Sequence, residues 1–73
     1  QTRRMSDLND AILEAHANND EVRLVALYTQ AANETNDVDT ACFFLTYAYI
    51  YALELGLRDA DTLYLRLDAY GRV

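Results

Sequence analysis

The sequence has 73 residues and contains no proline, tryptophan or lysine; glycine occurs only twice and cysteine only once. A single cysteine excludes a disulfide within the chain as a source of stability. Cys42 and His16 are the only soft or borderline metal ligands, so the sequence predicts neither a metal site nor a cofactor. Without proline, and with few glycines, the chain has few helix breakers. We therefore expect an all-α fold.

The length predicts one domain, which we place at residues 5–73, with residues 1–4 as a tag or a disordered tail. A chain this short buries only about 60% of the surface that it exposes when unfolded. Hydrophobic residues make up 52% of the sequence, at or above the usual range for a soluble domain. A small domain with this much apolar surface often shares it with a second chain. The composition therefore favours a homo-oligomer, most simply a dimer.

The charge balance is acidic, with six arginines against twelve acidic residues and a net charge of −6. This sign argues against nucleic acid and anionic membranes as partners. The apolar run at residues 41–55 is shorter than the ~20 residues of a membrane-spanning helix, and no signal peptide is visible. We therefore expect a cytoplasmic protein. The absence of lysine beside abundant alanine, aspartate and arginine suggests a GC-rich bacterial genome or salt adaptation.

Polar breaks divide the chain into four predicted helices. The first begins after an N-cap at Ser6 and ends at residues 18–20; the second runs from about residue 21 to 33. The third runs from about residue 37 to 55, with Asn36 as its N-cap and Gly56 as its left-handed end. The fourth is capped by Asp59 or Asp61 and stopped by Gly71. Because the breaks are short, neighbouring helices should be antiparallel. They would form two helical hairpins or a plain four-helix bundle.

Apolar residues at helical spacing predict the buried face of each helix. The expected inner residues are Leu8, Ala11, Ile12 and Ala15; Leu24, Val25, Leu27, Tyr28, Ala31 and Ala32; Ala41, Leu45, Ala48, Ala52 and Leu55; and Ala60, Leu63, Leu67 and Tyr70.

The third helix is apolar around its whole circumference, and Glu54 is the only charge between residues 41 and 55. Phe43, Tyr47 and Ile50 lie opposite its small-residue face. A helix that is apolar all round is either central in a core or covered by a partner. We therefore predict a protein interface at Phe43, Tyr47, Ile50 and Tyr51. Two alternatives stay open. These residues are simply large core side chains, or the chain is a carrier of small apolar ligands or a regulatory subunit, with a pocket lined by Tyr28, Tyr49 and Tyr64 and with Tyr51 beside them.

Several of these positions resemble the packing residues of tetratricopeptide repeats. The matching positions are Leu45, Ala48 and Tyr49, then Ala60, Tyr64 and Leu67, with Val25, Tyr28, Ala31 and Ala32 similar to a second repeat helix. The sequence departs from the repeat at Thr46, where glycine is usual, and lacks the terminal proline. The resemblance implies a scaffold of helical hairpins that binds a protein partner.

Catalytic patterns are weak in this sequence. Cys42 and His16 are a conceivable nucleophile and base, but no motif supplies an orienting acid or an oxyanion hole. The Asp-x-Asp pairs at residues 37–39 and 59–61 suit the first turns of helices and do not continue into a calcium loop. We therefore predict a non-enzymatic protein with no catalytic residues.

Overall fold

The computed structural model describes residues 2–72, with side chains from Asp7 onward. These residues form four helices: α1 (Thr2–Ala17), α2 (Glu21–Glu34), α3 (Val38–Leu55) and α4 (Asp59–Ala69). No strand occurs within residues 2–72. The predicted all-α class is confirmed.

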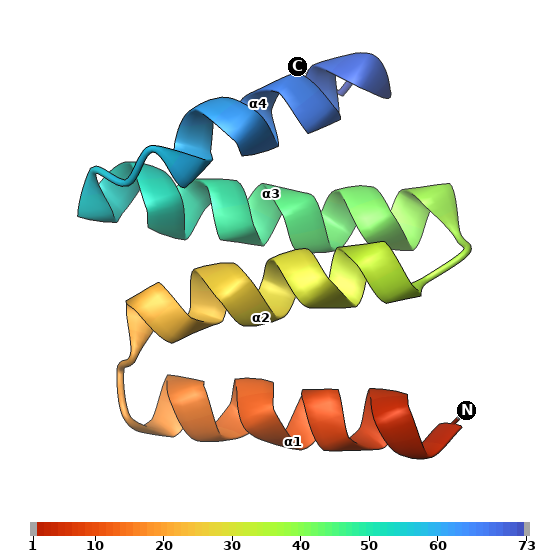
Figure 1. Cartoon of the computed structure of the whole chain (residues 1–73), viewed down its shortest axis with the longest axis vertical. Coiled ribbons are helices and arrows are strands. Elements are labelled where there is room, and N and C mark those ends of the chain that lie inside the picture. The colour runs from red at the N-terminus through yellow and green to blue at the C-terminus, as the bar shows by residue number, and fades with distance from the viewer. Residues whose placement is uncertain (1, 73) are drawn as a thin grey trace.

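The four helices lie side by side in chain order, each running opposite to the one before it (Figure 1). Close backbone contacts join α1 to α2, α2 to α3 and α3 to α4, and join no other pair of these helices. The principal dimensions of 30 × 27 × 13 Å describe a thin molecule. Within the described chain, α3 therefore has helix neighbours on its α2 and α4 sides only.

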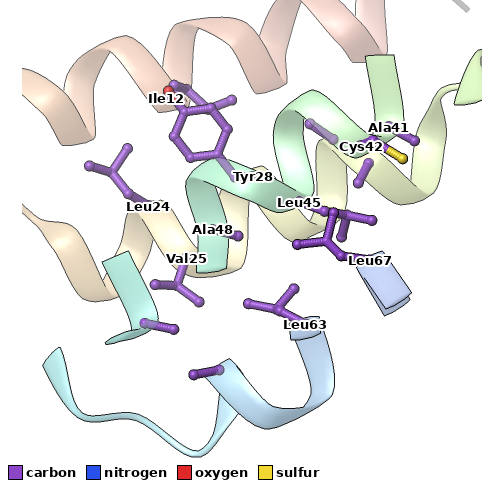
Figure 2. Packing of buried hydrophobic residues seen from close by; sticks show 14 of the residues in the cluster. Ile12, Leu24, Val25, Tyr28, Ala41, Cys42, Leu45, Ala48, Leu63 and Leu67 are labelled. Atoms are coloured by element: carbon purple, nitrogen blue, oxygen red, sulfur yellow. The ribbon is translucent and has the colours of Figure 1, made fainter. Parts of the chain in front are cut away.

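The core lies along the inner side of α2 and α3, and α1 and α4 cover its ends. Figure 2 shows side chains of α2, α3 and α4 converging in one cluster. On α3, Leu45, Ala48 and Ala52 are completely buried. The two alanines carry no side chain beyond Cβ, so the neighbouring helices can approach α3 closely. Most predicted inner residues are confirmed as buried, while Ala11 and Leu27 are half-buried.

Three predicted helix starts need correction. The helix start predicted after Ser6 is wrong, because α1 begins at Thr2 and includes part of the expected tail; Gln1 lies outside the described residues. The N-cap of α3 is Asp37 and not Asn36, because the Asp37 carboxylate accepts hydrogen bonds from both the backbone N–H and the hydroxyl of Thr40. These bonds lower the pKa of Asp37. Helix α4 starts after Arg58 without a side-chain cap, so neither predicted aspartate caps it.

Two residues predicted to be buried are exposed. Leu55 is 36% exposed and occupies the last residue of α3. Tyr70 is 45% exposed because it forms the C-cap of α4 and lies outside the regular helix.

Left-handed residues end α1, α3 and α4 in the same way. Asn19, Gly56 and Gly71 have φ values of 54°, 69° and 73°. Beyond Gly56, the backbone N–H of Leu57 donates to the carbonyl oxygen of Ala52 at 2.9 Å, as in a Schellman motif. Leu57 is half-buried against the core. The predicted roles of both glycines as helix stops are confirmed.

We expect Gly56→Ala to lower the free energy of unfolding by roughly 1 kcal/mol, because an L-residue is strained in the left-handed region. No atom lies within 4 Å of the added Cβ, so the backbone conformation alone sets this cost. Thermal unfolding followed by circular dichroism should show Tm lower by about 5 °C. Asn19→Gly is the matched control, since it should leave Tm unchanged or raise it. An unchanged Tm for Gly56→Ala would contradict the role of this helix end.

Candidate interaction surface

The side of α3 that faces away from the core is apolar and exposed. Its four large apolar side chains are Phe43, Tyr47, Ile50 and Leu53, which we call the outer face; they are 55%, 40%, 43% and 54% exposed. A fully exposed side chain of this kind presents roughly 200 Å², so the outer face offers on the order of 400 Å² of exposed surface. The largest apolar patch on a typical monomer is of this size and is often functional.

A second regularity runs along the same side of α3. Asp39, Phe43, Thr46, Ile50 and Leu53 follow one another at steps of four, three, four and three residues. We call this line of five residues the seam. Steps that alternate in this way average 3.5 residues, which is the spacing of the contact line in coiled coils. Thr46 suits such a line, because its hydroxyl already donates to the carbonyl oxygen of Cys42 at 2.8 Å.

The outer face rests on a group of packed rings. This ring cluster consists of His16, Tyr28, Phe43, Phe44, Tyr47 and Tyr51. Within it, the rings of Phe43 and Tyr47 meet edge to face with centroids 4.9 Å apart. The ring of Tyr47 in turn stacks on that of Tyr28 at 5.6 Å. Two exposed rings are therefore held in place by a buried one, which reduces the entropy that binding would cost.

Tyr28 anchors the ring cluster from α2. Its side chain is only 9% exposed, and its hydroxyl lies 2.8 Å from Nε2 of His16 on α1. Burial, followed by the nearby hydroxyls of Tyr51 and Tyr47, raises the pKa of Tyr28 above its ordinary value. The Tyr28 hydroxyl therefore stays protonated at neutral pH and can keep its hydrogen bond to His16.

The predicted interface residues fall into two groups. Phe43, Tyr47 and Ile50 are exposed, as the helical spacing indicated. Tyr51 is half-buried and packs against Tyr28 and His16, so it supports the outer face from beneath more than it extends it.

The structure does not bring the predicted pocket residues together. Tyr28 belongs to the ring cluster between α2 and α3, whereas Tyr49 packs on Tyr64 of α4 with ring centroids 6.0 Å apart. Tyr64 is 44% exposed. None of the hollows described below is lined by these three tyrosines. The geometry therefore gives no support to a tyrosine-lined ligand pocket.

Cys42 and His16, the conceivable nucleophile and base, are both engaged in packing contacts. Cys42 is a free thiol buried in the core, and His16 is engaged with Tyr28. Among the described residues, no group of three or more His, Cys, Asp or Glu side chains is placed to hold a metal ion. Cys42 therefore belongs to the core, and His16 belongs to the contact between α1 and α2.

A hollow of about 420 Å³ lies at the start of the seam. It is lined by Asp39, Cys42, Phe43, Thr46 and Arg72. The guanidinium of Arg72 forms an ion pair with the Asp39 carboxylate, and this bond raises the pKa of Arg72. Two smaller hollows have volumes of about 190 and 200 Å³, and Arg66 lines both. The first lies beside the turn between α2 and α3, and the second lies between α2 and α4. The largest of the three hollows therefore adjoins the outer face.

Four residues of this surface escaped the sequence prediction. Leu53 is 54% exposed and was not among the predicted interface residues. Asp39 and Thr46 could have been found from the alternating steps of four and three residues. Arg72 gave no such signal, because only the turn after α4 brings it beside Asp39.

Comparison with protein-family models, with curated proteins and with solved structures finds no match to this chain. No helix within residues 2–72 is both long and apolar enough to cross a membrane. Functional inference therefore rests on the surface chemistry of the chain itself.

Proposed function

We propose that this chain is a non-catalytic protein–protein interaction module that self-associates through the outer face of α3. The observation that carries the proposal is the exposure of four large apolar side chains on one side of a single helix. Aromatic residues are enriched in the cores of protein interfaces. The same residues are not core side chains of the single chain, because each of them is at least 40% exposed.

A second copy is the favoured partner because of how charge is distributed. The chain carries a net charge of −6, so most contacts between two copies would bring acidic groups together. Between Thr40 and Leu53, however, α3 contains no charged residue. Two copies can therefore meet along this helix with little electrostatic cost, and each covers the apolar surface of the other.

The area predicts a weak dimer. Two outer faces and their margins would bury roughly 1,000 Å², which is at the small end of specific interfaces. We expect a Kd of roughly 1–100 μM, and sedimentation velocity over a dilution series should show a monomer–dimer equilibrium in that range. A chain that remains monomeric at several hundred micromolar, by sedimentation and light scattering, would refute self-association.

Two broader expectations belong to the same proposal. The side-by-side helical hairpins suit the partner-binding scaffold that the resemblance to tetratricopeptide repeats implies. A reducing, cytoplasmic compartment suits a chain whose only thiol, Cys42, is buried and free.

A further inference from the structure

We propose that two copies pack with their α3 helices antiparallel, and that Arg72 of each copy faces Glu54 of the other. This inference rests on the proposed function and adds the orientation of the partner and a residue that selects it. Three observations support it: the spacing of the seam, the hollow at its start, and the charges at its two ends.

The seam gives the contact line. Its alternating steps of four and three residues allow two α3 helices to lie against each other over Asp39 to Leu53. In an antiparallel pair, the two-fold axis then passes midway between Thr46 and Ile50, at the level of residue 48. Phe43 of one copy lies opposite Leu53 of the second copy, and Thr46 lies opposite Ile50 of the second copy.

The hollow gives the fit. Asp39, Cys42, Phe43 and Thr46 stand at positions i, i+3, i+4 and i+7 of α3, and these four positions form the hole in knobs-into-holes packing. Arg72 closes one side of it. In the antiparallel register, the side chain that enters this hole is Leu53 of the second copy, an apolar residue that is 54% exposed in the single chain.

The charges give the orientation. The seam ends near one acid on each side, Asp39 at the start of α3 and Glu54 near its end. A parallel pair would place Glu54 beside Glu54 of the second copy with no cation of α3 between them. An antiparallel pair instead brings Glu54 to the end where Arg72 is bound to Asp39. Antiparallel helix dipoles favour the same arrangement.

Within one chain, Arg72 and Glu54 are too far apart to interact directly. Arg72 is held at Asp39, fifteen residues before Glu54, which corresponds to roughly 22 Å along the helix. Charges on the surface are largely screened beyond about 8 Å at physiological ionic strength. Any energetic coupling between these two residues must therefore pass through the second copy.

The test is a double-mutant cycle on the dimer Kd, with Arg72→Gln, Glu54→Gln and the double variant measured by sedimentation. An exposed ion pair changes an equilibrium by about threefold, and the dimer contains two such pairs, so Arg72→Gln should weaken association about tenfold. In the Glu54→Gln background, the same change should weaken it by no more than about twofold. Circular dichroism melts of each variant serve as a control and should show that the monomer remains folded.

The outcomes separate the two proposals. A wild-type dimer in which the effects of the two substitutions multiply, without coupling, overturns the antiparallel arrangement and leaves the proposed function standing. A wild-type chain without a dimer overturns the proposed function, and the orientation with it. The coupling between Arg72 and Glu54 should decrease as the salt concentration is raised from roughly 0.05 to roughly 0.5 M, because salt screens an exposed ion pair. Such a decrease supports the antiparallel arrangement.

Discussion

Ile50→Asp should convert the self-associating chain into a monomer. Ile50 lies at the centre of the outer face and is 43% exposed, so the single chain tolerates a carboxylate there. In the dimer, the same carboxylate would lie in an apolar contact without a partner, once in each copy. Burying an unpaired charge costs several kcal/mol, so we expect the Kd to rise at least ~100-fold. Sedimentation velocity at a concentration where the wild type is mostly dimeric measures the change.

Leu65→Asp and Leu13→Asp are matched controls for Ile50→Asp. Leu65 on α4 and Leu13 on α1 are 65% and 62% exposed, and each substitution adds the same charge. If surface apolarity in general drove association, all three variants would dissociate alike. If the outer face drives it, only Ile50→Asp, and Phe43→Asp beside it, lose the dimer. If the Ile50→Asp variant still formed dimers, the outer face of α3 could not be the interface.

Leu45→Ala should unfold much of the protein at 37 °C. Leu45 has no exposed surface and lies on the inner side of α3, between α2 and α4 (Figure 2). Removing such a leucine side chain costs about 2–5 kcal/mol, from lost burial and from the cavity that remains. A domain of this size has only about 5 kcal/mol of stability in total. We therefore expect Tm to fall by roughly 15–20 °C in a circular dichroism melt.

Leu53→Ala makes the comparison with Leu45→Ala informative. Leu53 belongs to the same helix and loses the same atoms, but it is 54% exposed and lies on the seam. It should change Tm little when the protein is dilute and monomeric, and it should weaken the dimer. A Leu45→Ala variant as stable as Leu53→Ala would mean that the inner and outer sides of α3 have been exchanged.

Helical periodicity predicted the buried side of each helix because burial follows directly from which residues share a face. Leu45, Ala48 and Ala52 were assigned correctly from spacing alone, and the exposed position of Ile50 follows from the same rotation. Helix starts were predicted less well, because several polar residues in a row can each act as a cap. Asp37 is the N-cap because Thr40 donates two hydrogen bonds to its carboxylate. Capping preferences of single residue types do not distinguish Asn36 from Asp37.

Contacts between segments that are distant in sequence could not be predicted from the sequence. The predicted tyrosine pocket was drawn from residue type, whereas the helix arrangement places Tyr28 and Tyr64 on different neighbours of α3. The pairing of Arg72 with Asp39 likewise depends on the direction in which the chain leaves α4. Such contacts depend on the packing angles of helices, which apolar spacing does not determine.

The order of the helices has a consequence for how the chain folds. Close backbone contacts join each helix only to the helix before it and the helix after it, so most of the packing joins segments that are close together in sequence. Chains with such local contacts fold within microseconds to milliseconds. The edge helix α1 has close backbone contacts with α2 alone. It should therefore open before the rest and exchange its amide hydrogens faster than α3 does. Because α3 has a helix on each side, it would open later than α1, and the surface proposed for the second copy lies on a persistent part of the chain.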